Sequence, residues 1–161
     1  MKEQKFEFLF DEYDSADELK IADKLLLVEA RNATKRSYAP YSHFYVAAAA
    51  RLSNGKVVTG TNQENASFPV GICAERVLLG SVSSFYPGIP IETIAISYES
   101  KNVVSDHPIA PCGMCRQALQ EFEGRMKTPV RLILGGMEGK IYVLKSASLL
   151  LPLAFTSEEL A

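Results

Sequence analysis

Three cysteines in two short fragments place the strongest constraint on how this 161-residue chain can fold. Cys112 and Cys115 lie three residues apart, so on the first turn of a helix both thiols face the same side. Pro111 favours a helix start here, because the first helical position needs no backbone N–H. Cys73 opens the fragment Cys-Ala-Glu-Arg, which we expect to begin a second helix. If the fold brings the two helix starts together, three thiolates would surround one Zn²⁺ and leave its fourth tetrahedral position open for water, as in a catalytic site.

Other uses of the three cysteines agree less well with the sequence. An odd number of thiols cannot pair completely within one chain, and disulfides are rare in a reducing compartment. A structural zinc site would need a fourth protein ligand, but neither His43 nor His107 stands at a ligand spacing from the cysteines. A structural site and three unliganded core thiols stay as the alternatives to a catalytic zinc.

Glu75 and Arg76, in the fragment that begins at Cys73, supply two groups that a three-thiolate site requires. Three thiolates give the zinc cluster a net negative charge, which weakens the ion as a Lewis acid. The helix N-termini and hydrogen bonds from Arg76 would offset that charge. The Glu75 carboxylate, two residues past a ligand, can reach the bound water and act as a proton shuttle. Taken alone, Glu75 is also a common first-turn acid of a helix, and Arg76 an ordinary surface residue.

The composition indicates one domain that acts on a small molecule. Apolar residues make up 47% of the chain and charged residues 22%, an ordinary balance for a globular protein with one core. Residues 1–19 form an acidic N-terminal extension, and the rest of the chain has no stripe of basic side chains, so we expect no nucleic-acid partner. No apolar run approaches the ~20 residues of a membrane helix. The N-terminus does not resemble a leader, so the cytoplasm is the expected compartment.

The apolar periodicity predicts an α/β fold with helices on the faces of a sheet. Ser15 is a suitable N-cap for a helix over 16–36, which should bury one stripe of its side chains. That stripe is Leu19, Ala22, Leu25, Leu26 and Ala30. Further helices are expected over 73–83 and 112–122, and a short one in 146–151.

Five strands are expected, and two of their connections predict how neighbouring strands pair. The strands are 43–52, 56–61, 91–98, 130–134 and 140–144. The Asn54-Gly55 pair is a hairpin signal between the first two strands. The link between the last two strands is too short for a parallel crossover, so they should pair antiparallel.

Five fragments, in this order, resemble the short homotetrameric cytidine deaminases, and the similarity runs from about residue 25 to residue 160. The fragments are Tyr38-Ala39-Pro40-Tyr41-Ser42-His43-Phe44, Asn62-Gln63-Glu64-Asn65-Ala66, Cys73-Ala74-Glu75-Arg76, Pro111-Cys112-x-x-Cys115-Arg116-Gln117 and Leu151-Pro152-Leu153-Ala154-Phe155. The resemblance implies a three-layer α/β/α sandwich with a five-stranded mixed sheet whose last two strands are antiparallel. It also implies one Zn²⁺ per chain and the hydrolytic deamination of free cytidine and deoxycytidine to uridine and deoxyuridine plus ammonia, a reaction of pyrimidine salvage.

The resemblance further implies which residues bind the nucleoside. Asn62 and Glu64 would hydrogen-bond the ribose 3′-hydroxyl, Phe44 would pack against the pyrimidine, and the backbone at Ala74 would help to hold the base. Three more residues would reach the active sites of neighbouring subunits in an obligate homotetramer. These are Ala66, Phe68 and Phe155.

The chain departs from the family pattern in three places. Phe68 stands where a tyrosine is common, Ala47 stands where glycine is usual, and residues 1–19 match no family role. Without the resemblance, core packing would be the simpler interpretation of Phe44 and Phe155.

Rival functions also follow from this kind of site. Deaminases of cytosine-containing antibiotics such as blasticidin S resemble it, although Asn62-x-Glu64 favours a ribose reader. A polynucleotide deaminase is disfavoured by the missing basic surface and by the antiparallel final hairpin. A non-catalytic, zinc-stabilised interaction module is opposed by Glu75 and by the open fourth ligand position.

Overall fold

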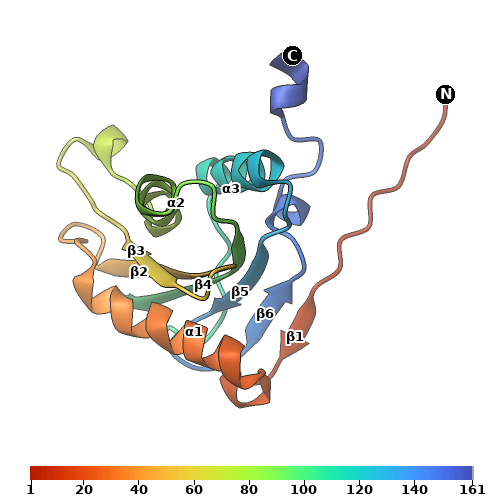
Figure 1. Ribbon diagram of the computed structural model, residues 1–161. Coiled ribbons are helices and arrows are strands. Elements are labelled where there is room, and N and C mark those ends of the chain that lie inside the picture. The colour runs from red at the N-terminus through yellow and green to blue at the C-terminus, as the bar shows by residue number, and fades with distance from the viewer. Residues whose placement is uncertain (161) are drawn as a thin grey trace.

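A six-stranded mixed β-sheet with helices on both faces forms the body of the chain in the computed structural model, which describes residues 1–160 (Figure 1). The strand order is β1-β6-β5-β4-β2-β3. The strands are β1 Asp11–Tyr13, β2 Phe44–Leu52, β3 Val57–Thr61, β4 Ile91–Ser100, β5 Arg131–Gly135 and β6 Ile141–Leu144. The helices are α1 Ile21–Ala33, α2 Ala74–Phe85 and α3 Gly113–Met126. Helix α1 covers one face of the sheet, and α2 and α3 cover the other, which makes three layers.

Small residues in β2 and β3 let the helices approach the sheet closely. Successive side chains of a strand point to opposite faces, so Ala48 lies in the core beneath α2 and α3, and Ala49 in the core beneath α1. Ala47, in place of the usual glycine, is also completely buried in β2. At Gly60 of β3 a side chain would overlap the backbone of α2 at Leu78, so glycine there sets the height of α2 above the sheet.

The expectation of five strands was wrong, because the N-terminal extension adds a sixth. β1 pairs antiparallel with β6 and places Glu12 opposite Tyr142. Residues 11–13 carry no alternating apolar pattern, and their extended conformation comes from pairing with the otherwise open edge of β6. An ion pair between Glu12 and Lys140 reinforces this contact. The expected antiparallel pairing of the last two strands, β5 and β6, is confirmed.

The helix predicted over 16–36 is divided near its start. Ser15 caps only a 3₁₀ turn, Ala16–Glu18, by accepting a hydrogen bond from the N–H of Asp17 at 3.2 Å. Leu19 is then extended, and α1 begins at Ile21.

The buried face of α1 differs from the predicted stripe. Ala22 and Leu25 are exposed, although the prediction placed them inward. The buried residues of the helix are Asp23, Leu26, Leu27, Ala30 and Ala33. Asp23 takes an inward position because its carboxylate pairs with Arg131 at 2.9 Å and Arg51 at 3.5 Å. Hydrophobic periodicity considers only apolar residues and cannot predict that an ion pair will bury an aspartate. The predicted orientation of the helix was therefore wrong.

The topology brings the starts of α2 and α3 to one edge of the sheet. Strand β2 is antiparallel to both β3 and β4, and β4 is parallel to β5, so the carboxyl ends of β3, β4 and β5 lie together. Residues 62–73 connect β3 to α2, and residues 101–112 connect β4 to α3. The carboxyl ends of parallel strands are where α/β proteins commonly bind ligands.

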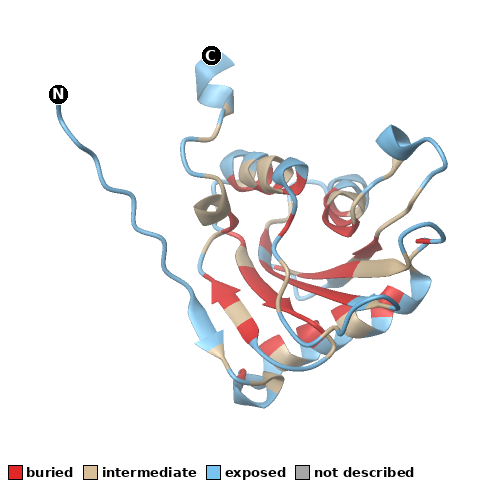
Figure 2. Ribbon diagram, turned by 180° about the vertical axis from the view of Figure 1, so that it is seen from behind, coloured by how far each residue is buried: buried red, intermediate tan, exposed pale blue. Residues whose placement is uncertain are grey.

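Burial is concentrated in the sheet and in the helix faces turned toward it (Figure 2). Residues 1–10 are exposed throughout, and the chain before Phe10 extends away from the body of the fold. Within residues 1–160, no helix has the length and apolar character needed to cross a membrane.

Candidate metal centre and active site

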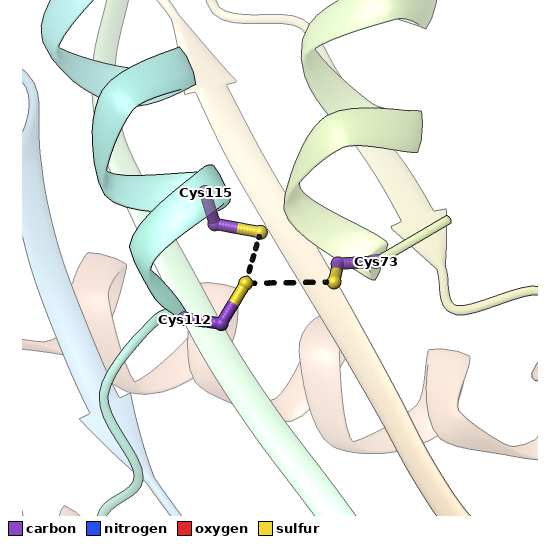
Figure 3. Close-up of side chains that lie close together, drawn as sticks. All are labelled: Cys73, Cys112 and Cys115. Carbon is purple, nitrogen blue, oxygen red and sulfur yellow. Dashed lines mark hydrogen bonds between the residues drawn. The ribbon is translucent and has the colours of Figure 1, made fainter. Parts of the chain in front are cut away.

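The thiols of Cys73, Cys112 and Cys115 meet between the N-termini of α2 and α3 (Figure 3). The Cys112 sulfur lies 3.8 Å from the Cys73 sulfur and 3.6 Å from the Cys115 sulfur, and all three lie within 4.8 Å of one another. In a tetrahedral site with Zn–S bonds of ~2.3 Å, two sulfurs are separated by about 3.8 Å. No other histidine, cysteine or carboxylate among the described residues joins this group. The cluster therefore fits zinc bound by three protein donors.

Helix capping explains how the three thiols converge. Cys73 is the N-cap of α2 and Cys112 the N-cap of α3, both with extended backbone, and Cys115 follows in the first turn of α3. The nearby Cys115 thiol lowers the pKa of Cys73 to about 5 against the opposing effect of desolvation, with further help from Cys112 and Arg76. The proximity of Cys73, together with burial, raises the pKa of Cys115 far above its ordinary value. Without a metal, one thiol of the cluster ionises readily while another keeps its proton. A cation bound by all three sulfurs would displace that proton.

Glu75 lies in the first turn of α2 with only 4% of its surface exposed. Burial raises the pKa of its carboxyl, and the negative charge of Cys73 adds to that rise, while a hydrogen bond from the Cys115 thiol partly opposes it. The carboxyl group therefore interacts electrostatically with the thiols without being one of the three grouped donors. A buried acid of raised pKa beside a metal centre is suited to proton transfer.

Arg76 faces the same cluster from the next position of α2. Its guanidinium donates a hydrogen bond to the carbonyl of Gly71 at 3.3 Å, and its positive charge helps to lower the pKa of Cys73. Its Nε is buried and has no hydrogen-bond partner among the described residues. A buried cationic donor with spare capacity fits a cluster that becomes more negative when its thiols ionise.

The carboxylate of Glu64 lies in the connection between β3 and α2 and borders a cavity of about 400 Å³. It accepts hydrogen bonds from the Tyr41 N–H at 2.9 Å, from the Ser42 N–H at 3.3 Å and from the Ser42 hydroxyl. Desolvation opposes ionisation, but the hydrogen bonds from Ser42 and Tyr41 hold the pKa of Glu64 below its usual value. Glu64 is therefore a charged acceptor at the rim of the cavity.

Asn62 already holds the start of β2 in place. Its side-chain oxygen accepts from the N–H of Val46 at 2.8 Å, and its amide nitrogen donates to the carbonyl of Phe44 at 2.9 Å. One amide N–H and one lone pair stay available, so a second partner is still possible. The predicted ribose contact of Asn62 must share the amide with this backbone bridge.

Phe44 and Ala74 lie in different elements of the fold. Phe44 is half-buried at the first position of β2 and stacks on Tyr98, with ring centroids 4.9 Å apart. Ala74 is completely buried directly after Cys73, so its backbone lies beside one thiol of the cluster.

The structure does not bring Ala66, Phe68 and Phe155 to the thiols of their own chain. Ala66 is exposed, Phe68 is 76% exposed, and Phe155 is 59% exposed. The Phe68 ring meets the edge of Tyr41, with centroids 6.0 Å apart, at the rim of the cavity. The carbonyl of Phe155 accepts a hydrogen bond from the Gln117 side chain at 2.9 Å.

Two residues of the site were missed by the sequence interpretation. The Ser42 hydroxyl donates a hydrogen bond to the Glu64 carboxylate. In the sequence, only its position within the Tyr38–Phe44 fragment indicated a role at the site. Tyr98 ends the strand predicted over 91–98. Tyrosine is common in strands, so its presence there did not indicate a role at the site. Its contact with Phe44 depends on the pairing of β2 with β4.

Comparison with known proteins agrees with this arrangement. Residues 20–130 match the family described as the cytidine and deoxycytidylate deaminase zinc-binding region. A cytidine deaminase from Halalkalibacterium halodurans is 37% identical over 139 residues, covering 85% of this chain and 96% of the relative. A second, from Sporosarcina psychrophila, is 32% identical and covers 84% and 93%.

Solved structures are similar in fold as well as sequence. The crystal structure of cytidine deaminase from Burkholderia pseudomallei has 41% identity and a TM-score of 0.70, covering 81% of this chain and 97% of that one. The cytidine deaminase from Mycobacterium tuberculosis has 29% identity and a TM-score of 0.65, covering 84% and 98%. The chain therefore belongs to the cytidine and deoxycytidylate deaminase family of zinc-binding enzymes.

Proposed function

We propose that this chain catalyses the zinc-dependent hydrolysis of free cytidine and deoxycytidine to uridine and deoxyuridine, with release of ammonia. The observation that carries the proposal is the buried Glu75 carboxyl beside three thiols at zinc spacing. The similarity to the cytidine deaminases of Halalkalibacterium halodurans and Burkholderia pseudomallei supports cytidine as the substrate. The enzyme would act in pyrimidine salvage in the cytoplasm, as one catalytic domain preceded by the acidic segment 1–19.

In this proposal Cys73, Cys112 and Cys115 hold one zinc ion per chain. When bound, the zinc supplies Lewis acidity that lowers the pKa of a coordinated water. Arg76 and the two helix N-termini offset the negative charge of the thiolates and so preserve that acidity.

Glu75 moves the protons of the reaction. Its carboxylate takes a proton from the attacking water as the C4–O bond forms, and delivers that proton to N3 of the cytosine ring. It then carries the proton of the added hydroxyl to the exocyclic nitrogen, the C4–N bond breaks, and ammonia leaves. The raised pKa of Glu75 favours this work, because a shuttle must both hold and release a proton near neutral pH.

The nucleoside would be held from both ends. Glu64, charged and fixed by Ser42, would accept a hydrogen bond from the ribose 3′-hydroxyl, with the spare N–H or lone pair of Asn62 beside it. The ring of Phe44 would pack on the pyrimidine, and the backbone of Ala74 would contact the base. A cavity of about 400 Å³ next to Glu64 is in the range of small-molecule sites.

The working enzyme would be a homotetramer with shared active sites. Ala66, Phe68 and Phe155 are exposed in the single chain and would complete the pockets of neighbouring subunits. Burial of the Phe68 and Phe155 rings between subunits would cover apolar surface that is exposed in the single chain. We propose no nucleic-acid or membrane partner.

A substrate panel tests the proposal. Ammonia release is measured with cytidine, deoxycytidine, deoxycytidine monophosphate, blasticidin S and a cytosine-containing single-stranded oligonucleotide. We expect turnover of the two nucleosides with kcat/KM at least about a hundredfold above that of the other three, because these lack a free ribose or carry a phosphate. Preferential turnover of blasticidin S or of the oligonucleotide would replace the nucleoside assignment.

A further inference from the structure

Tyr98 is completely buried near the carboxyl end of β4, and the proposed mechanism gives it no task. It pairs with Val46 of β2, and it shares the side of the sheet with Ile94 and Ile96, which pack in the core beneath α2 and α3. Phe44, two residues before Val46, points to the same side. Tyr98 therefore lies on the face of the sheet that carries the metal centre, under the ring proposed to contact the base.

The ring of Tyr98 supports the ring of Phe44. The two rings are stacked, with centroids 4.9 Å apart and planes inclined by only 18°. Phe44 is half-buried and Tyr98 is 0% exposed, so one face of Phe44 is covered by Tyr98. An offset aromatic stack of this kind holds a ring in one orientation better than aliphatic contact does.

The hydroxyl of Tyr98 reaches in another direction, to the connection that leads into α3. It lies 3.3 Å from both ring nitrogens of His107 and donates to the carbonyl of Val104 at 3.5 Å. His107 is in turn 3.0 Å from the carboxylate of Asp106. The connection runs on from His107 to Cys112, the N-cap of α3 and a metal ligand in the proposed function.

The other side of this connection is held by the turn between β5 and β6. The carbonyl of Ser105 accepts a hydrogen bond from the N–H of Met137 at 2.7 Å. Side chains at Gly136 and Gly139 would overlap the backbone of Ser105 and Asp106, so the turn lies directly against the connection. The segment Ser105–His107 is thus clamped between the turn and the Tyr98 hydroxyl.

We propose that Tyr98 is a positioning residue that couples the two halves of the active site. Its ring sets the orientation of Phe44, and its hydroxyl fixes the connection that delivers Cys112 to the metal. A leucine or phenylalanine would fill the same space without reaching His107, and a buried phenol is stable only with a partner for its O–H. The inference rests on the proposed function, because it takes Phe44 as the base platform and Cys112 as a zinc ligand.

Two substitutions separate the two tasks. Tyr98→Phe keeps the ring and removes the hydroxyl, so it should transfer zinc to the chelator pyridylazoresorcinol about fivefold faster, with KM for cytidine within about twofold of the parent. Tyr98→Leu removes the ring as well, so it should in addition raise KM for cytidine about fivefold, with a smaller change in kcat. His107→Ala should accelerate zinc transfer as Tyr98→Phe does, and the double variant Tyr98→Phe, His107→Ala should be no faster than either one.

Tyr142 provides the matched control. It lies opposite Glu12 of β1 and its ring packs on Phe10, at the other end of the sheet order from β2. Tyr142→Phe and Tyr142→Leu should lower the melting temperature without changing zinc transfer or KM. If the Tyr98 variants behave in the same way, Tyr98 is ordinary core and the inference is overturned. If Tyr98→Leu changes only KM or only zinc transfer, the coupling of the two halves is overturned.

The zinc measurement also separates this inference from the proposed function. It uses the unmodified full-length chain and its variants, loaded with Zn²⁺, without any substrate. A parent protein that binds zinc but deaminates no cytosine nucleoside would refute the proposed function. The zinc-transfer rate of Tyr98→Phe can still be compared with that of the parent in this case. An unchanged rate would overturn the inference about Tyr98, whatever the result for activity.

Discussion

The sulfur atoms of Cys73 and Cys112 lie 3.8 Å apart although 39 positions separate the two residues in the sequence. Each residue is the N-cap of its helix, so the contact joins the start of α2 to the start of α3. A cation held there would connect the chain that follows β3 with the chain that follows β4. Because a ligand that binds only the folded state adds to its stability, zinc and folding should be linked in this protein.

Cys112→Ser should remove the zinc and lower the melting temperature. The parent protein is expected to contain about one zinc per chain, because three thiolates converge on a single ion. Metal analysis and thermal unfolding measure both effects. Met114→Ser is the control, since Met114 is exposed on the same turn of α3 and lies outside the cluster. Zinc-free parent protein with full activity would contradict the mechanism.

Glu75→Gln should keep the zinc and lose at least about a thousandfold in kcat. The amide has nearly the same shape as the carboxyl but cannot accept and return a proton. Steady-state kinetics with cytidine, together with metal analysis, test this expectation. Glu121→Gln removes an exposed carboxylate of α3 and should leave kcat unchanged. A Glu75→Gln enzyme within tenfold of the parent would exclude Glu75 as the proton shuttle.

Arg76→Ala should bind zinc but react more slowly below neutral pH. Without the guanidinium beside Cys73, the thiolates place more negative charge on the metal, and the attacking water should ionise at higher pH. The rising limb of the pH–rate profile is therefore expected to move upward. Arg125→Ala, at an arginine that binds Ser83 on the outer side of the helices, should leave the profile in place. An unmoved profile for Arg76→Ala would assign the charge compensation to the helix N-termini alone.

Glu123→Ala should destabilise the fold by about 2–4 kcal/mol without changing kcat. The buried carboxylate of Glu123 accepts from the N–H groups of Val130 at 2.5 Å and Ser148 at 2.8 Å, and from the hydroxyl of Ser146. These bonds attach the end of α3 to the start of β5 and to the chain after β6. Urea unfolding measures the loss, with the exposed Glu121→Ala as control. An unchanged unfolding midpoint would show that the carboxylate contributes nothing net.

Deletion of residues 152–161 should raise KM for cytidine or abolish turnover while the zinc is retained. The deletion removes Phe155, which is exposed in its own chain and is proposed to enter a neighbouring active site. A shorter deletion of residues 157–161 keeps Phe155 and should have a smaller effect. Sedimentation and activity measured across one dilution series test the shared site directly. A fully active monomer would refute the shared site but not the deaminase assignment.

The sequence alone was sufficient for the parts of this protein that depend on short-range geometry. The three-residue spacing of Cys112 and Cys115 predicts two thiols on one helical turn, and the structure has both in the cluster. The short link between β5 and β6 admits only an antiparallel pair, which is what forms. Spacing rules of this kind hold because the backbone has few local conformations, so neighbouring residues limit one another strongly.

Only the tertiary structure decided the features that depend on contacts between distant segments. β1 is a strand because β6 offers it an open edge, and Asp23 is buried because Arg131 meets it from another strand. Tyr98 lies against both Phe44 and His107 because β2 pairs with β4 and the turn after β5 presses on the connection to α3. A hydrophobic pattern records whether a side chain is apolar, but not which partner will neutralise a charge or bind a hydroxyl. Those partners are brought together only when the whole sheet has formed.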